Sequence, residues 1–133
     1  MKIGVTGSQG FIGGWVRREL LRRGHEVVVF DRYPRTPMAD GEAFFLGDIE
    51  NSNSVTEMAA HVDAVIHLAA VLGTQETIQN PRPSAVTNIM GGLNVFEAAA
   101  QYRLPVVYAG GGNAWMRDHA TGSYTISKTC VED

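Results

Sequence analysis

A phenol and an ammonium group stand four residues apart near the end of this 133-residue sequence, at Tyr124 and Lys128. Residues four apart lie on one face of an α-helix, so a helix here would bring the two side chains together. A tyrosine has an ordinary pKa of about 10, and a neighbouring cation favours its phenolate form, which can act as a base. The spacing alone also fits an exposed helix whose lysine reaches solvent. The pair therefore indicates proton transfer only if a binding site lies beside it.

Three glycines at the other end of the chain, Gly7, Gly10 and Gly13, follow a short apolar run. In a strand, turn and helix of this kind they allow a tight turn, close approach of a ligand to the backbone, and close helix packing. The helix N-terminus then offers unpaired N–H groups and a partial positive charge to a pyrophosphate. Asp31 follows the apolar run 26–30, where an acceptor for ribose hydroxyls is expected. A flexible loop is the alternative for the glycines alone, but the combination predicts a dinucleotide site.

Apolar runs and helical periodicities place these residues on alternating elements. Strands are expected at residues 2–6, 26–30, 43–46, 64–68 and 105–109. Helices are expected at residues 11–23, from a Ser52 or Asn53 cap to about 61, at 83–102, and from 123 onward. This order implies right-handed crossovers and a parallel sheet with helices on both faces. The sequence therefore predicts an α/β, Rossmann-like doubly wound sheet of strand order 3-2-1-4-5, as one domain over residues 1–133.

Two helices carry patterns that make further predictions. The first has apolar positions that should face the sheet: Phe11, Ile12, Trp15, Val16, Leu20 and Leu21. Its other face, expected to be solvated, carries Arg17, Arg18, Arg22 and Arg23. In the 83–102 helix, Gly91 and Gly92 each cost about 1 kcal/mol relative to alanine, which favours close packing of another backbone against them.

The composition is that of an ordinary globular protein, with 44% hydrophobic residues and a net charge of -3, and it does not favour nucleic-acid binding. The one cysteine, Cys130, excludes an internal disulfide framework and suits a reducing compartment. Neither a signal-peptide pattern nor an apolar run long enough to cross a bilayer is seen, so a cytoplasmic protein without membrane association is expected. His67 ends a buried strand away from other metal-ligating residues, which predicts a hydrogen-bonded structural histidine and no metal site.

The run from Thr6 to Gly13 resembles the glycine motif of the extended short-chain dehydrogenase/reductase family. Other stretches are similar to that family as well: Gly47-Asp48-Ile49, His67-Leu68-Ala69-Ala70, Asn88 to Ala98, and the Tyr124/Lys128 pair. The resemblance covers essentially the whole chain and is closest to the nucleotide-sugar epimerases and dehydratases. In those enzymes a tightly held NAD takes a hydride from the sugar and later returns it.

The resemblance implies roles for single residues. Tyr124 would be the catalytic base, Lys128 its partner and a ribose ligand, and Asn88 a residue that holds a helix kink or a water. Asp31 would accept from the adenosine ribose and Asp48 would contact adenine. The implied cofactor-binding set is Gly7, Gln9, Gly10, Phe11, Ile12, Gly13, Asp31, Arg32, Asp48, Ile49, Leu68, Ala69, Ala70 and Lys128. An acid at position 31 repels a 2′-phosphate, so NAD is expected rather than NADP, although Arg32 leaves NADP open.

Two departures from the family pattern bear on activity. Gly111 stands where the family has a serine or threonine whose hydroxyl binds the substrate oxygen, and losing such a donor commonly costs on the order of a hundredfold in rate. Asn113, Thr121 or Ser123 could substitute for it from other backbone positions. The sequence also ends at Asp133, before the further strands and the C-terminal substrate domain of extended members, so it is expected to lack most of a substrate pocket.

Three hypotheses follow from these patterns. The first is an NAD-dependent nucleotide-sugar epimerase or dehydratase with Tyr124 as base. The second is a catalytically impaired dinucleotide-binding module or subunit, as Gly111 suggests, and the third is a structural protein that binds no nucleotide. In the family, the helices corresponding to 83–102 and 123–133 form a dimer interface, so the resemblance predicts a homodimer.

Overall fold

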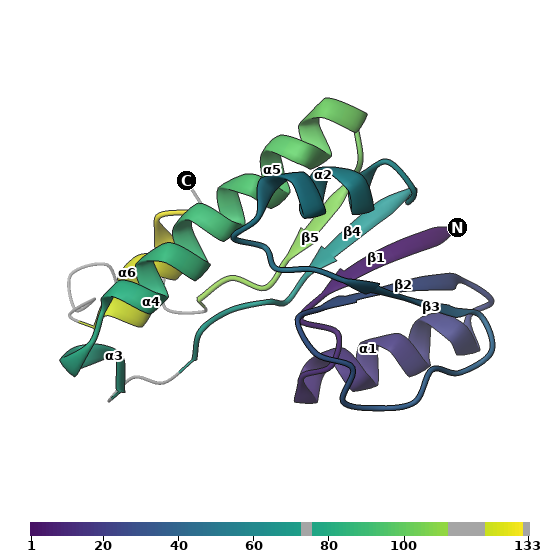
Figure 1. The fold of residues 1–133 in the computed structure, drawn as a ribbon, viewed down its shortest axis with the longest axis horizontal. Helices are drawn as coiled ribbons and strands as arrows, with labels where there is room; N and C mark the ends of the chain where they lie inside the picture. The colour runs from purple at the N-terminus through teal and green to yellow at the C-terminus, as the bar shows by residue number, and fades with distance from the viewer. Residues whose placement is uncertain (73–75, 112–121, 132–133) are drawn as a thin grey trace.

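Five parallel strands form a single sheet in the computed structural model, which describes residues 1–72, 76–111 and 122–131. The strands are β1 (Lys2–Thr6), β2 (Glu26–Asp31), β3 (Glu42–Leu46), β4 (Ala64–His67) and β5 (Val106–Tyr108). Their order across the sheet is β3-β2-β1-β4-β5, with β1 at the centre (Figure 1). Each neighbouring pair is parallel. The predicted fold class and strand order are confirmed.

Helices cover both faces of this sheet. They are α1 (Phe11–Arg22), α2 (Ser52–Ala59), α3 (Glu76–Gln79), α4 (Arg82–Ser84), the π-helix η1 (Ala85–Met90), α5 (Gly91–Tyr102) and α6 (Ser123–Thr129). Helix α1 lies on one face, and α2 and α5 lie on the other (Figure 1). Elements α4, η1 and α5 follow one another directly and form the helix predicted at 83–102, whereas the short α3 was not predicted. None of the helices in the described part of the chain has the length and apolarity of a membrane-spanning helix.

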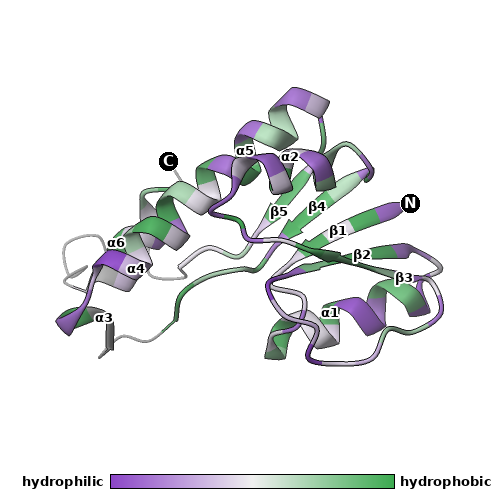
Figure 2. Cartoon of the chain, viewed as in Figure 1, coloured by the Kyte–Doolittle hydropathy of each residue, from purple (hydrophilic) through white to green (hydrophobic). Residues whose placement is uncertain are grey.

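Strand β2 shows why the strands appear in the sequence as continuous apolar runs. Val27 and Val29 pack on the α1 side, while Val28 and Phe30 pack on the α2 and α5 side. Alternate residues of a strand point to opposite faces, and both faces are covered here, so every position must be apolar. Figure 2 shows this as largely hydrophobic colouring of the strands between helices of mixed character. The two hydrophobic cores, one on each face, hold the sheet in place and so position the loops that follow its strands.

The prediction for α1 is only partly right. Val16, Leu20 and Leu21 pack against the sheet, but Phe11, Ile12 and Trp15 are 86%, 61% and 59% exposed. They lie in the first turns of the helix, ahead of the part that packs on the strands. Arg17 was expected in solvent and is instead only 6% exposed, whereas the exposed positions of the other helix arginines, Arg18, Arg22 and Arg23, agree with the prediction. Arg17 is buried because its guanidinium forms an ion pair with Glu42 at 2.6 Å.

The cap of α2 also differs from the prediction. Asn51, not Ser52 or Asn53, is the N-cap, and its side-chain oxygen accepts hydrogen bonds from the backbone N–H groups of Asn53 and Ser54 at 3.0 and 3.2 Å. Asparagine is among the best N-cap residues because its oxygen satisfies N–H groups that have no partner within the helix. The helix ends at Ala59, earlier than expected.

Gly91 and Gly92 do not pack against another backbone as predicted. A Cβ on Gly91 would lie 2.7 Å from Cδ1 of Ile49, and one on Gly92 would lie 3.0 Å from Cγ1 of Val131. The two glycines therefore make room for side chains, one from the segment after β3 and one from the segment after α6.

Candidate functional site

A cavity of about 440 Å³ lies at the carboxyl ends of the strands. Segments that follow all five strands line it, together with the first turn of α1, η1 and α6. Strand β1 is paired with β2 on one side and with β4 on the other, so the connections diverge at this point of the sheet. Open α/β sheets bind their ligands in the crevice outside the carboxyl ends of the strands, where the connections diverge in this way.

The cavity brings the predicted site residues together. All fourteen residues of the predicted cofactor-binding set lie in its wall, and so does Tyr124. Asn88 lies behind the wall rather than in it. The wall also contains residues that the sequence reasoning did not select: Phe30, Arg35, Gly47, Leu72, Thr87, Ala109 and Gly110. Ala109 and Gly110 could have been found from their place directly after β5, but no local pattern marks Arg35 or Thr87.

The turn after β1 has the geometry that its glycines allow. Gly7 has a positive φ of 67°, and a Cβ there would lie 2.6 Å from the backbone nitrogen of Ala69. A Cβ on Gly13 would lie 2.7 Å from Cα of Ser8. Gly10 is the N-cap of α1 and provides no side-chain hydrogen bond to the helix. The first turn of α1 therefore meets the cavity with backbone N–H groups that no capping side chain occupies, as an anion site requires.

Asp31 is held at the end of β2 by two backbone hydrogen bonds. Its Oδ2 accepts from the backbone N–H of Gln9 at 2.9 Å, and its Oδ1 accepts from that of Arg32 at 2.8 Å. Asp48 lies across the cavity wall, where its Oδ1 accepts from the backbone N–H of Glu50 and its Oδ2 is 3.8 Å from Nη1 of Arg32. The site thus combines two fixed carboxylates with a helix N-terminus.

Helix α6 places Tyr124 and Lys128 in the same wall, as their spacing predicted. The Lys128 side chain is buried, at 3% exposure, and its Nζ lies 4.2 Å from the ring centroid of Tyr108. The Tyr108 hydroxyl donates to the backbone oxygen of Lys128 at 3.3 Å. A ring face attracts a cation, with an energy of about 0.5 to 2 kcal/mol depending on desolvation. Lys128 therefore lines the cavity while its ammonium group contacts the ring of Tyr108.

Asn88 ties two parts of the wall together from within η1. Its Nδ2 donates to the backbone oxygen of Val71 at 3.1 Å and to Oγ of Ser127 at 2.9 Å. Its Oδ1 accepts from the backbone N–H of Val71 at 2.8 Å. The side chain is buried, and π-helical turns are frequent at functional sites. Asn88 is a positioning residue in this structure, because it joins α6 to the segment after β4.

His67 is buried under the site and is hydrogen-bonded, as predicted. Its Nδ1 lies 2.6 Å from Oγ1 of Thr6, and its ring stacks on Tyr108 with centroids 5.5 Å apart. Burial, and secondarily the charge of Lys128, lower the pKa of His67 to about 4. Among the described residues, no cluster of three or more His, Cys, Asp or Glu could hold a metal ion.

The buried His67 should make stability depend on pH. In the unfolded chain a histidine has a pKa of about 6.5, whereas His67 in the folded chain has a pKa of about 4. Between these two pH values the unfolded state therefore binds a proton that the folded state does not bind. The free energy of unfolding should fall by up to about 3 kcal/mol as the pH drops from 6.5 to 4. Urea unfolding across this range should show the loss in wild type and in His61→Gln, whose histidine is exposed, but not in His67→Gln. Equal slopes for all three would contradict the assignment.

Gly111, the position at which the family has a hydroxyl donor, has no side chain to supply one. Gly111 follows β5 and is partly buried, while Ala109 and Gly110 before it line the cavity. Of the predicted substitutes, Asn113 and Thr121 lie outside the described residues, as does the side chain of Ser123. Among the described side chains of the cavity wall, only Tyr124 on α6 and Thr87 on η1 carry a hydroxyl group. Neither belongs to the segment after β5.

Comparison with known proteins gives consistent matches. Over 112 residues the chain is 32% identical to the UDP-N-acetyl-alpha-D-glucosaminuronate decarboxylase of Bacillus cytotoxicus, a match that covers 79% of this chain and 35% of that protein. The structure of Thermus thermophilus UDP-glucose 4-epimerase in complex with NAD matches with a TM-score of 0.87 and 30% identity, over 99% of this chain and 49% of that one. Thermotoga maritima UDP-glucose 4-epimerase with UDP-glucose matches with a TM-score of 0.88 and 26% identity, over the same shares.

The chain spans about a third of the length of the curated relative and about half of the two solved structures. Residues 3–132, which are nearly the whole chain, match the family model described as "NAD dependent epimerase/dehydratase family". With the glycine turn, the strand order and the α6 pair found in one cavity, this match establishes that the chain belongs to the NAD-dependent epimerase/dehydratase family.

Proposed function

We propose that the chain binds NAD in the cavity at the carboxyl ends of the strands and takes part in epimerisation or dehydration of a nucleotide-sugar. The observation that carries this proposal is that one cavity wall contains the glycine turn, the fixed Asp31 and the Tyr124/Lys128 pair. The related epimerases named above were solved with NAD or with UDP-glucose. Residues 1–133 would then act as one dinucleotide-binding domain.

The residues present fit a dinucleotide. A Cβ on Gly7 or Gly13 would overlap neighbouring backbone, so the glycines allow the tight turn that brings the first turn of α1, with its N–H groups, to the proposed pyrophosphate site. Asp31 would accept from the adenosine ribose, and Asp48 and Ile49 would lie beside the adenine. A 2′-phosphate near the Asp31 carboxylate would be repelled by about 1 to 4 kcal/mol at 4 Å, depending on the local dielectric. NAD is therefore favoured over NADP.

Bound NAD would supply a hydride acceptor, and the proton chemistry would fall to α6. Tyr124 would take the proton from the sugar hydroxyl that is oxidised, and return it when the product forms. Lys128 is buried in the same wall, where its ammonium would bind ribose hydroxyls. Asn88 would keep α6 and the segment after β4 in register through its three hydrogen bonds.

Two measurements test this function. Calorimetric titration of the chain with NAD should show binding, and titration with a panel of UDP-, GDP- and TDP-sugars should then change the absorbance band of reduced nicotinamide. Binding without any response to sugars would favour the second candidate, a dinucleotide-binding module without efficient chemistry, for which Gly111 is the supporting observation. Failure to bind any adenine dinucleotide would reject both candidates.

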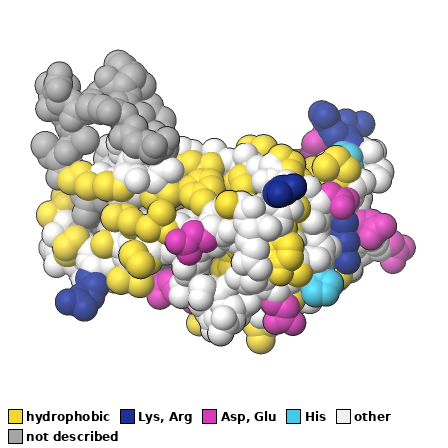
Figure 3. Space-filling view, turned by 90° about the horizontal axis from the view of Figure 1, so that it is seen from above, with side chains coloured by type: hydrophobic (Ala, Val, Ile, Leu, Met, Phe, Trp, Pro, Cys, Tyr) yellow, Lys and Arg dark blue, Asp and Glu magenta, His cyan; other side chains and the backbone are white. Residues whose placement is uncertain are grey.

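A cytoplasmic homodimer formed through the helices at 83–102 and 123–133 is part of the same proposal. Large apolar side chains are exposed on these helices, at Val86, Met90, Leu93 and Ile126. Figure 3 shows hydrophobic side chains gathered over the face that carries α5. Contiguous exposed apolar surface of this kind is typical of interaction sites. Light scattering should therefore give the mass of a dimer for wild type and for Trp15→Glu on the opposite face, and that of a monomer for Leu93→Glu. A monomeric wild type would count against the dimer.

A further inference from the structure

The segment after β2 is fastened at both of its ends to one residue of the glycine turn. At the start of the segment, the backbone N–H of Gln9 donates to Oδ2 of Asp31 at 2.9 Å. At its end, Oε1 of Gln9 accepts from the backbone N–H of Thr36 at 3.0 Å and from its hydroxyl at 2.7 Å. Residues 32–35 therefore form a short arch, which we call the 32–35 arch, between two anchors on Gln9.

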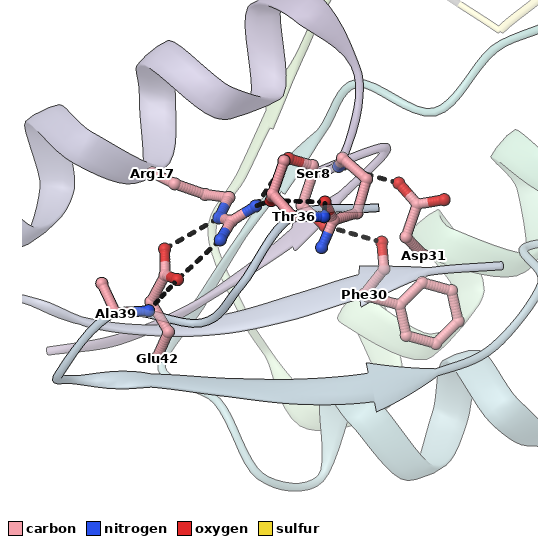
Figure 4. Close-up of polar contacts among 8 residues, drawn as sticks. Ser8, Arg17, Phe30, Asp31, Thr36, Ala39 and Glu42 are labelled. Atoms are coloured by element: carbon pink, nitrogen blue, oxygen red, sulfur yellow. Dashed lines mark hydrogen bonds and ion pairs between the residues drawn. The ribbon is translucent and has the colours of Figure 1, made fainter. Parts of the chain in front are cut away.

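Arg17 donates a hydrogen bond to the second anchor, at Thr36 (Figure 4). Its Nη1 donates to Oγ1 of Thr36 at 3.1 Å, while its Nε and Nη2 donate to the two carboxylate oxygens of Glu42 at 2.7 and 2.6 Å. The side chains of Arg17 and Glu42 are 7% and 2% exposed. A bidentate pair of this kind is rigid, and the burial of both charges makes each dependent on the other. Gln9, Arg17, Thr36 and Glu42 together make a clamp on the arch.

Three members of the clamp lie outside the cavity wall, whereas Gln9 and the arch help to form it. Arg32 and Arg35 line the cavity beside Asp31, but Arg17, Thr36 and Glu42 do not. Nη1 of Arg32 is 3.8 Å from Oδ2 of Asp48, and its guanidinium lies over the ring of Tyr33 at 5.9 Å. The position of the arch thus determines where the guanidinium groups of Arg32 and Arg35 lie relative to the carboxylate of Asp31.

We propose that the clamp sets the preference between NAD and NADP by holding the 32–35 arch in place. This inference rests on the proposed function, since it requires a dinucleotide in the cavity with its adenosine ribose near Asp31. With the arch fixed, the carboxylate of Asp31 faces the ribose hydroxyls and Arg32 is directed to Asp48. A released arch lets Arg32 and Arg35 approach the 2′ position, where they attract a phosphate. Arg17 and Thr36 are positioning residues: both act through the arch, and Arg17 also donates from its Nη1 to the backbone oxygen of Ser8 in the glycine turn at 3.5 Å.

Thr36→Val is the sharpest test. Thr36 is exposed, so the change should leave the fold intact, and it removes both hydroxyl hydrogen bonds while it leaves the Arg17–Glu42 pair in place. Calorimetric titration of the full chain with NAD and with NADP should show that the ratio of the two dissociation constants shifts toward NADP by about tenfold. Arg17→Met should shift the ratio in the same direction. Arg18→Met is the matched control, because this neighbouring arginine is exposed and lies outside the cavity wall, and it should leave the ratio unchanged.

The outcomes separate the possibilities. A purely structural clamp would lower stability, or the affinity for both dinucleotides alike, and an unchanged ratio in Thr36→Val would overturn the proposal. An equal shift in Arg18→Met would also overturn it, because the effect would then be one of net charge. Arg17→Met leaves Glu42 buried without its partner; should that variant not fold, Thr36→Val alone decides. A wild type that binds neither dinucleotide would instead refute the proposed function, before any substitution is made.

Discussion

Replacing Gly13 by alanine should weaken NAD binding by about a hundredfold, whereas the same change at the next residue, Gly14, should leave binding intact. A Cβ on Gly13 would overlap the backbone oxygen of Gly7 and lie 2.7 and 2.8 Å from Cα and C of Ser8. All three neighbours are backbone atoms, so no rotamer change can relieve the overlap. The helix would have to move away from the turn, and its N–H groups would move with it out of the proposed pyrophosphate site.

Gly14 is a close control because it differs from Gly13 only in its surroundings. A Cβ at Gly14 meets no atom within 4 Å, and alanine is favoured over glycine inside a helix by about 1 kcal/mol. Gly14→Ala should therefore raise the unfolding temperature and bind NAD as wild type does. Titration calorimetry measures the affinities, and circular dichroism shows whether Gly13→Ala keeps its fold. A folded Gly13→Ala with wild-type affinity would remove the turn from the proposed site.

The fold could be predicted because its signals are local. The apolar run of β2 indicates a strand covered on both faces, and the spacing of Gly7, Gly10 and Gly13 indicates the turn that fixes α1 against β1. Burial of Arg17 could not be predicted in this way, because its partner Glu42 is 25 residues away in β3. Helical spacing likewise shows which residues share a face but not where the sheet ends, so the exposure of Phe11 was missed.

The candidate site was predicted to the extent that its residues come directly after strands, belong to the glycine turn or form the spaced pair Tyr124/Lys128. Thr87 and Arg35 belong to none of these groups. Thr87 reaches the cavity from η1, where its hydroxyl donates to the carboxylate of Glu50. The wider π-helical turn there leaves no mark in the hydrophobic spacing of the 83–102 segment. Arg35 lies in the proline-containing segment after β2, and it reaches the cavity because long-range contacts of Gln9 and Arg17 hold that segment.

Tyr124→Phe should lower the turnover of a nucleotide-sugar by about a hundredfold to ten-thousandfold and change NAD affinity little. The substitution removes only the phenolic hydroxyl, the group proposed to accept the proton, and leaves an aromatic ring of the same size in the cavity wall. Lys128 should stay in place, since the face of Tyr108 holds its ammonium group at 4.2 Å. Chromatography of the nucleotide-sugar product gives the turnover, because the hydride returns to the sugar and reduced nicotinamide does not accumulate, and calorimetry gives the affinity.

Tyr102→Phe provides the comparison. Tyr102 is also a tyrosine on a helix, but it lies at the exposed end of α5, away from the cavity. Its turnover should equal that of wild type. If Tyr124→Phe also retained full turnover, the proton acceptor would have to be another group, and the pairing with Lys128 would be structural. If wild type bound NAD but turned over no sugar, loss of the donor at Gly111 would outweigh the presence of Tyr124, because a base cannot compensate for a substrate oxygen that no hydrogen-bond donor holds beside it.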